Sequence, residues 1–159
     1  MSKLYLLCGK IAAGKSTKAK ELANQDLTIL LSEDHWMSIL FPNEINNLQD
    51  YVKYSARLRK AIAPHVNSLL SKGVSVVMDF PANTIEQRNW LRTLFETAQA
   101  DHELHFIDLS DEICKKRLHN RNASGVHPYQ VSDEQFDLFT SYFVPPDDSE
   151  GFNVILHHN

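Results

Sequence analysis

The chain has 159 residues, of which 43% are hydrophobic and 23% charged, a composition typical of a globular protein with one buried core. Its net charge is −4 and it has no run of Lys or Arg, so we expect no long nucleic acid as a partner. No apolar run is long enough to span a bilayer, and residues 1–4 lead into a strand pattern rather than a signal peptide, so we expect a cytoplasmic protein with no membrane partner.

The first predicted element is an apolar strand over residues 3–8, and a phosphate-binding motif follows it. The motif is G-x-x-x-x-G-K-S, and residues 15–24 after it predict a helix. Such a P-loop binds phosphate through successive backbone N–H groups and the positive N-terminus of the helix. The predicted nucleotide-binding residues are Gly9, Lys10, Ile11, Ala12, Ala13, Gly14, Lys15, Ser16 and Thr17.

Two side chains of this motif have predicted roles in catalysis. Lys15 is expected to reach the β- and γ-phosphates, and the Ser16 hydroxyl is expected to ligate Mg²⁺. Gly9 and Gly14 permit backbone conformations that a side chain would block. The alternative is a glycine-containing turn that binds nothing.

The second predicted strand, residues 27–31, ends at a polar cluster. Ligands of open α/β sheets bind beyond the carboxyl ends of the strands. We therefore predict Asp34 as the base that accepts the proton of an acceptor hydroxyl. The alternatives are an N-cap for a helix over residues 35–40, a water-mediated contact to Mg²⁺, and Glu33 as the base. Trp36 is a candidate substrate contact, with core packing as its alternative.

Residues 47–71 have apolar side chains at helical spacing, and Pro64 predicts a kink or break near residues 60–63. Gly73 is expected to end this helix. Residues 74–79 predict a central third strand that ends on Asp79, as a Walker B strand does. Asp79 is expected to hold a water of the magnesium ion or the substrate, and N-capping is the alternative.

A capping box at residues 84–87 predicts a helix to about residue 98. Arg88, one turn into this helix, is a candidate substrate contact, with a surface role as its alternative. Residues 103–109 predict the fourth strand. The following helix, 111–121, has Arg117 and Arg121 four residues apart and therefore on one face.

Both arginines lead into a polar loop over residues 122–131. We predict a lid over about residues 117–132, in which Arg117 and Arg121 stabilise the charge of a transferred phosphoryl group. A solvated basic face is the alternative. A last helix begins at Ser132 and has Phe136, Phe139 and Phe143 on one face, and residues 154–156 predict a short strand.

The alternation of strands and helices predicts one α/β domain over residues 1–159, with a parallel sheet between two layers of helices. The chain has no N/T-K-x-D segment after a strand, which argues against a switch GTPase. A mechanical ATPase usually needs a larger body or an arginine from a partner, whereas here arginines are present in the same chain.

Several segments resemble one family of small proteins. They are Leu7-Cys8-Gly9, Asp34-His35-Trp36, Arg121-Asn122 and Phe143-Val144-Pro145-Pro146. Together with the P-loop they resemble the small P-loop kinase-like ATP-binding proteins of the AAA-domain-33 type, which are related to bacteriophage polynucleotide kinase, chloramphenicol phosphotransferase and zeta toxins.

The resemblance implies a three-layer P-loop NTPase fold with strand order 2-3-1-4-5, a small helical lid, and ATP and Mg²⁺ as cofactors. It also implies transfer of the γ-phosphate of ATP to a hydroxyl of a small molecule. The chain lacks the extra domain and basic channel of polynucleotide kinases and is shorter than zeta toxins, so a small-molecule acceptor is expected. The alternative is a nucleotide-binding or ATPase module that regulates without an acceptor. We expect a monomer or a homodimer.

Overall fold

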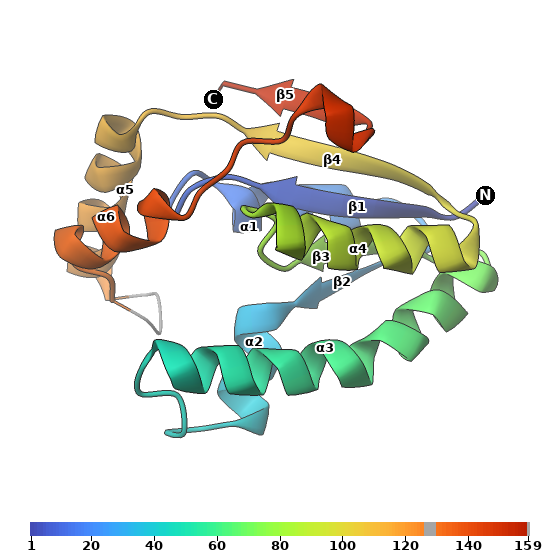
Figure 1. Ribbon diagram of the computed structural model, residues 1–159, viewed down its shortest axis with the longest axis horizontal. Helices are drawn as coiled ribbons and strands as arrows, with labels where there is room; N and C mark the ends of the chain where they lie inside the picture. Colours follow the sequence, from blue (N-terminus) through green and yellow to red (C-terminus); the bar gives the residue numbers. More distant parts are fainter. Residues whose placement is uncertain (126–129, 159) are drawn as a thin grey trace.

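The computed structural model describes residues 1–125 and 130–158. Its strands form one parallel sheet in the order β2-β3-β1-β4-β5, which confirms the expected topology (Figure 1). The strands are β1 (Lys3–Cys8), β2 (Thr28–Ser32), β3 (Ser75–Asp79), β4 (Asp101–Ile107) and β5 (Val154–His157). Strand β1, which leads into the P-loop, is therefore central, as its continuous apolar sequence predicts.

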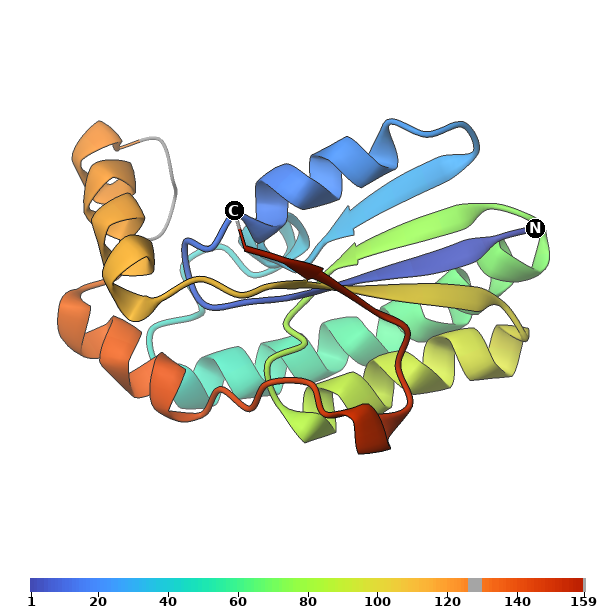
Figure 2. The same ribbon diagram turned by 90° about the horizontal axis from the view of Figure 1, so that it is seen from above.

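The helices lie on both faces of the sheet. Helix α1 covers one face, α3 and α4 cover the other, and α5 and α6 lie beyond the carboxyl ends of the strands (Figures 1 and 2). The helices are α1 (Lys15–Ala23), α2 (Glu33–Leu40), α3 (Leu48–Ser71), α4 (Ile85–Ala98), α5 (Asp111–Ser124) and α6 (Asp133–Ser141), and a 3₁₀ turn, η1, spans Asp148–Glu150. Within the described residues, no helix has both the length and the apolar character needed to cross a membrane.

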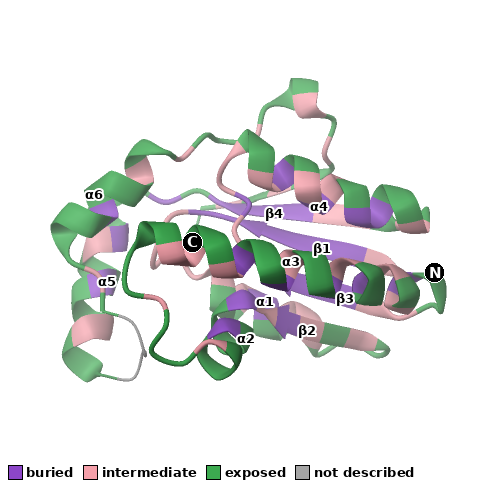
Figure 3. Ribbon diagram, turned by 60° about the horizontal axis from the view of Figure 1, so that its bottom comes forward, coloured by how far each residue is buried: buried purple, intermediate pink, exposed green. Residues whose placement is uncertain are grey.

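Burial follows these layers. The central strands are buried, whereas the outer faces of the helices are exposed (Figure 3). The largest apolar cluster fills the space between the sheet and helices α3 and α4. A second cluster, which includes Ala13, Leu118 and Phe136, joins the P-loop to α5 and α6. The P-loop therefore lies on a packed base, and α5 is fixed beside it. Cys8 and Cys114 are buried free thiols, as expected.

At Pro64 the sequence predicts a kink or a break of helix α3. The helix bends but runs without a break from Leu48 to Ser71, so of these two alternatives the break is wrong (Figure 1). A proline removes one hydrogen bond of a helix, and the packing of Leu58, Ile62 and Val66 in the core holds the remaining turns together. Gly73 has φ 87° and follows the helix, and the N–H of Val74 donates to the carbonyl of Leu69 at 2.9 Å, as in a Schellman motif.

Two elements near the lid also differ in extent. Helix α5 is three residues longer than predicted and ends at Ser124, followed by Gly125 at φ 65°. Residues 126–129 of the predicted lid lie outside the described residues. In α6, Phe136 is fully buried but Phe139 is 39% exposed, and Phe143 lies after the end of the helix, so the predicted aromatic face holds only in part.

Candidate functional site

The P-loop joins β1 to α1 in a conformation that requires small residues. Gly14 has φ 105°, and Ala12 also lies in the left-handed region at φ 63°. Gly9 is needed for space, because a Cβ there would lie 3.0 Å from the carbonyl oxygen of Ile107. The N–H of Gly9 donates to Asn83 Oδ1 at 2.9 Å, so the loop is tied to the chain that follows β3. Sequence reasoning did not find Asn83, whose only signal is its position after that strand.

The ammonium of Lys15 lies across the loop. Its Nζ donates to the carbonyl oxygens of Gly9 and Lys10, the latter at 2.8 Å. Burial lowers the pKa of Lys15, while the charges of Asp79 and Asp34 act in the opposite direction. A partly dehydrated ammonium in a P-loop is a strong partner for phosphate oxygens.

Ser16 and Asp79 lie together, as the two Walker motifs predict. Ser16 Oγ donates to Asp79 Oδ2 at 3.0 Å. Burial raises the pKa of Asp79, and the hydrogen bond from Ser16 and the charge of Lys15 oppose that rise. Asp79 is not an N-cap, because Thr84 caps α4.

This pair fits the requirements of Mg²⁺. The described residues contain no group of three His, Cys, Asp or Glu side chains able to hold a metal. Mg²⁺ is usually held by one or two carboxylates together with waters and substrate phosphates, and Ser16 and Asp79 match that smaller set.

Asp34 is an exposed residue in the first turn of α2. The N-cap of α2 is Ser32, whose side chain accepts from the N–H of His35 at 3.4 Å, so the N-cap alternative for Asp34 is wrong. The charge of Asp34 acts on Lys15 and Arg121, raising the pKa of each against the effect of burial. Asp34 therefore lies in the electrostatic field of the P-loop lysine and of α5.

The two arginines of α5 lie near the P-loop and Asp34. Arg117 Nη1 donates to the carbonyl oxygen of Ala13 at 3.2 Å. Arg121 is half-buried, and its Nε has no hydrogen-bond partner within the described chain. Burial lowers the pKa of Arg121. The fold thus brings the P-loop, Asp34, Asp79 and both arginines to one end of the sheet.

Glu33, beside Asp34, faces the interior. It is 2% exposed, and the hydroxyl of Tyr51 on α3 donates to Glu33 Oε1. Burial raises the pKa of Glu33 to about 7, although Tyr51 and the charge of Arg59 act in the opposite direction. Sequence reasoning counted Tyr51 as part of an apolar stripe and overlooked its hydroxyl.

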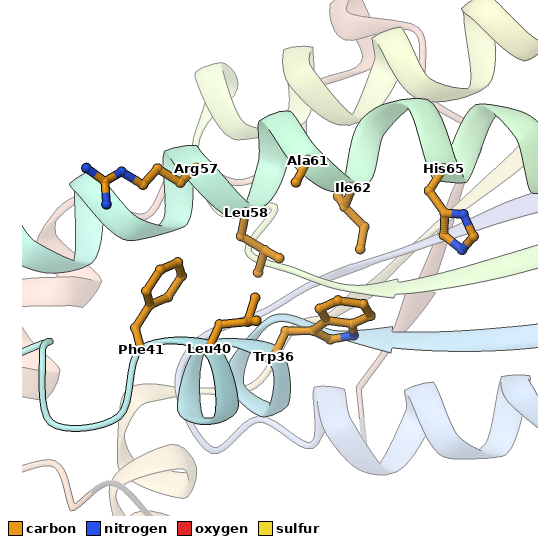
Figure 4. A pocket seen from close by; sticks show the side chains of 8 residues that line it. All are labelled: Trp36, Leu40, Phe41, Arg57, Leu58, Ala61, Ile62 and His65. Atoms are coloured by element: carbon orange, nitrogen blue, oxygen red, sulfur yellow. The ribbon is translucent and has the colours of Figure 1, made fainter.

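Trp36 lies at a different place from Asp34. It is 36% exposed, so core packing does not describe it. It lines an apolar pocket of about 500 Å³ between α2 and α3 (Figure 4). The lining residues are Trp36, Leu40, Phe41, Arg57, Leu58, Ala61, Ile62 and His65, and they include neither Asp34 nor the P-loop. Residues two apart in a helix do not face each other, which explains the separation.

The structure corrects the predicted role of Arg88. Its side chain is 0% exposed, so neither a substrate contact nor a surface role fits this structure. Its Nε and Nη2 donate to the Glu150 carboxylate at 2.8 and 3.2 Å, and its Nη1 donates to the Ala82 carbonyl at 2.9 Å. Arg88 therefore joins α4 to the segment before β5.

Comparison with known proteins gives a family and a set of similar folds. The family model AAA_33, described as an AAA domain, matches residues 4–146. No curated protein sequence matches the chain.

Three solved structures illustrate the shared fold. A protein of Chloroflexus aurantiacus with a provisional description as a kinase is 19% identical, with a TM-score of 0.73 over 98% of this chain and 84% of that one. A sugar kinase of a Janibacter species is 13% identical, with a TM-score of 0.65 over 98% and 84%. Chaetomium thermophilum Kti12 in complex with ADP-AlF3 is 14% identical, with a TM-score of 0.67 over 96% and 87%. At these identities the likeness concerns the fold, which is that of P-loop kinase-like nucleotide-binding proteins.

Proposed function

Because this chain belongs to the AAA_33 family of AAA domains, we propose that it is a kinase that uses ATP and Mg²⁺ to phosphorylate a hydroxyl of a small molecule. The observation that carries the proposal is the position of Asp34. This exposed carboxylate follows the end of β2, where Ser32 pairs in register with Asp79 of β3, and its charge acts on the P-loop lysine and on an arginine of α5. A module that only binds nucleotide has no need of such a base.

In the proposed reaction, the P-loop amides and Lys15 hold the phosphates of ATP. Ser16 and Asp79 would hold Mg²⁺, which supplies charge neutralisation at the β- and γ-phosphates. Asp34 accepts the proton of the acceptor hydroxyl, and that oxygen bonds to the γ-phosphorus as the bond from this phosphorus to the β–γ bridging oxygen breaks. Arg117 and Arg121 stabilise the charge on the transferred group, and ADP leaves.

Three features support a small acceptor in a cytoplasmic setting. The chain has no basic run for a long nucleic acid, its P-loop follows the central strand of a single sheet, and its two cysteines are free thiols. The alternative is a nucleotide-binding or ATPase module without an acceptor. The similarity to Kti12, which was solved in complex with ADP-AlF3, is the observation that favours this alternative.

The test is transfer of label from [γ-³²P]ATP with Mg²⁺ to a panel of nucleosides, sugars, hydroxy acids, aminoglycosides, chloramphenicol and 5′-hydroxyl oligonucleotides. The proposal expects a labelled small molecule. Tight ATP binding with slow hydrolysis that no member of the panel accelerates would favour the module without an acceptor.

A further inference from the structure

Arg59, near the middle of α3, is a partly enclosed cation that has no ion-pair partner among the described residues. Its side chain is half-buried, and its Nε is buried without a hydrogen bond. It makes no ion pair or hydrogen bond with any residue in the described ranges. Buried guanidinium nitrogens are nearly always paired, as those of Arg88 are with Glu150. An unpaired one therefore points to a ligand.

The position of Arg59 relates it to the proposed reaction. Its guanidinium carbon lies 5.2 Å from the ring centroid of Trp90 on α4, so the side chain spans from α3 to the helix that follows β3. Its charge also acts on Glu33 and Tyr51. The ring of Trp90 lies 5.9 Å from that of Phe80, which directly follows Asp79, so Arg59 lies near the edge of the sheet where Asp79 ends β3.

A second unpaired atom lies in the same place. Glu33 Oε2 is buried and has no hydrogen-bond partner among the described residues. Among the described residues no ion pair within 4.0 Å joins Glu33 to Arg59, although the charge of Arg59 opposes the rise in the pKa of Glu33. Tyr51 donates to the other oxygen of Glu33 and so fixes this carboxyl group. A buried donor on Arg59 and a buried acceptor on Glu33 thus have no hydrogen-bond partner among the described residues.

We infer, on the basis of the proposed function, that the acceptor carries an anionic group, a carboxylate or a phosphate, which Arg59 binds while Asp34 receives its hydroxyl. The planar guanidinium matches either group with two parallel hydrogen bonds. Stacking against Trp90 fixes the plane of the guanidinium before the ligand binds. The substrate class is therefore a hydroxy acid or a sugar phosphate.

Trp90 provides a direct probe of this site. The chain has two tryptophans, and a Trp36→Phe background leaves the fluorescence of Trp90 alone. We would saturate this protein with Mg²⁺ and a non-hydrolysable ATP analogue. We would then titrate it with glucose, gluconate and glucose 6-phosphate, and with glycerol, glycerate and glycerol 3-phosphate. Within each series the carbon skeleton is shared, and the carboxylate and phosphate arms distinguish the two anions.

We expect a saturable change in Trp90 fluorescence with an anionic member of at least one series and none with its neutral counterpart. Arg59→Gln should weaken that binding by roughly tenfold or more, while the affinity for the ATP analogue stays the same. Arg57→Gln is the matched control, since Arg57 carries the same charge two residues earlier on α3 but is exposed, 5.3 Å from the ring of Tyr54. It should bind as the parent does.

Equal affinity for the neutral and anionic members, no response to any anion, or equal affinities of the two arginine variants would each overturn the inference. The comparison within each series uses the parent protein, so it holds even if Arg59→Gln folds poorly. The titration involves no turnover. Anion binding without phosphoryl transfer would therefore count against the kinase and not against the anion site. Transfer to neutral acceptors alone would count against the anion site and not against the kinase.

Discussion

Three P-loop residues are each held in place by a partner from another part of the chain. Gly9 is bonded to Asn83, Ser16 to Asp79, and Ala13 to Arg117. The loop is thus organised for phosphate before any ligand binds, which reduces the entropy cost of binding. Lys15 differs, because its present partners are carbonyl oxygens of the loop itself.

Lys15→Ala should weaken ATP binding by about 100-fold, since a hydrogen bond from a charged donor contributes roughly 1.5–3 kcal/mol. Isothermal titration of ATP with Mg²⁺ measures this directly. Lys18→Ala, one turn further along α1 and paired with Glu21, is the control and should bind ATP like the wild type. Similar affinities of the Lys15 and Lys18 variants would show that Lys15 does not contact the nucleotide.

At the residue scale, the sequence predicts the P-loop because spacing alone defines that motif. The sequence does not show which arginines lie in the site and which are structural. Arg88 and Arg121 have the same chemistry, but Arg88 is buried against Glu150, which lies 62 residues away, and Arg121 lies in the field of Asp34. Such partners are brought together only by the tertiary fold, so the role of Arg88 was predicted wrongly.

At the scale of elements, the segment between α6 and β5 is fastened across α4. The Arg88–Glu150 pair and a hydrogen bond from Val144 N–H to the Asn83 carbonyl at 2.8 Å hold it. Asn83 also contacts the P-loop through its side chain. This segment therefore supports the same residues that support the nucleotide site.

Arg88→Met should lower the free energy of unfolding by about 3 kcal/mol, because it leaves the Glu150 carboxylate buried without its partner. Urea unfolding at pH 7 measures this change. The double variant Arg88→Met/Glu150→Gln should lose less stability, since no unpaired charge remains. A double variant at least as unstable as the single one would contradict this explanation.

The element boundaries show where local signals suffice. Caps predicted the starts of α4, α5 and α6, because Thr84, Ser110 and Ser132 accept hydrogen bonds from nearby backbone N–H groups. Pro64 predicted a kink or a break without deciding between them, because the cost of a proline is local whereas the packing that keeps α3 continuous comes from the sheet. Helix α5 is longer than predicted because its C-cap is Gly125, which the sequence pattern did not identify as the end of the helix.

At the scale of the whole molecule, two histidines on the neighbouring strands β4 and β5 contact each other at the edge of the sheet. His105 Nδ1 and His157 Nε2 are 2.9 Å apart, so one ring must accept and stay neutral. Burial lowers the pKa of both, and for His105 the Glu103 carboxylate opposes this. The unfolded chain therefore binds more protons below the ordinary histidine value of 6.5. Stability from this pair is present above that pH and is lost as the pH falls.

The urea midpoint should therefore fall between pH 7.5 and pH 5.5, and His157→Gln should reduce that fall. His158→Gln, at the exposed neighbouring position, is the control and should keep the pH dependence of the wild type. An equal fall in both variants would mean that the acid sensitivity arises elsewhere, for example at His102, whose pKa burial also lowers.

The overall fold was the most predictable level, because alternating apolar strands and helices after a P-loop permit few topologies. The strand order came from the family resemblance and is confirmed. The acceptor side of the site was not predictable, because Glu33, Tyr51 and Arg59 come from two helices whose contact no motif records.

The account's central claim is that this site transfers phosphate and that Asp34 is its base. The most direct measurement is the rate of label transfer from [γ-³²P]ATP by Asp34→Asn, beside the affinity of the same variant for ATP. We predict unchanged affinity and a 10²- to 10⁴-fold lower rate, the usual contribution of a positioned base. Full transfer by Asp34→Asn, or an equal loss of ATP affinity and rate, would contradict the role of Asp34, and loss of transfer in Glu33→Gln alone would give that role to Glu33.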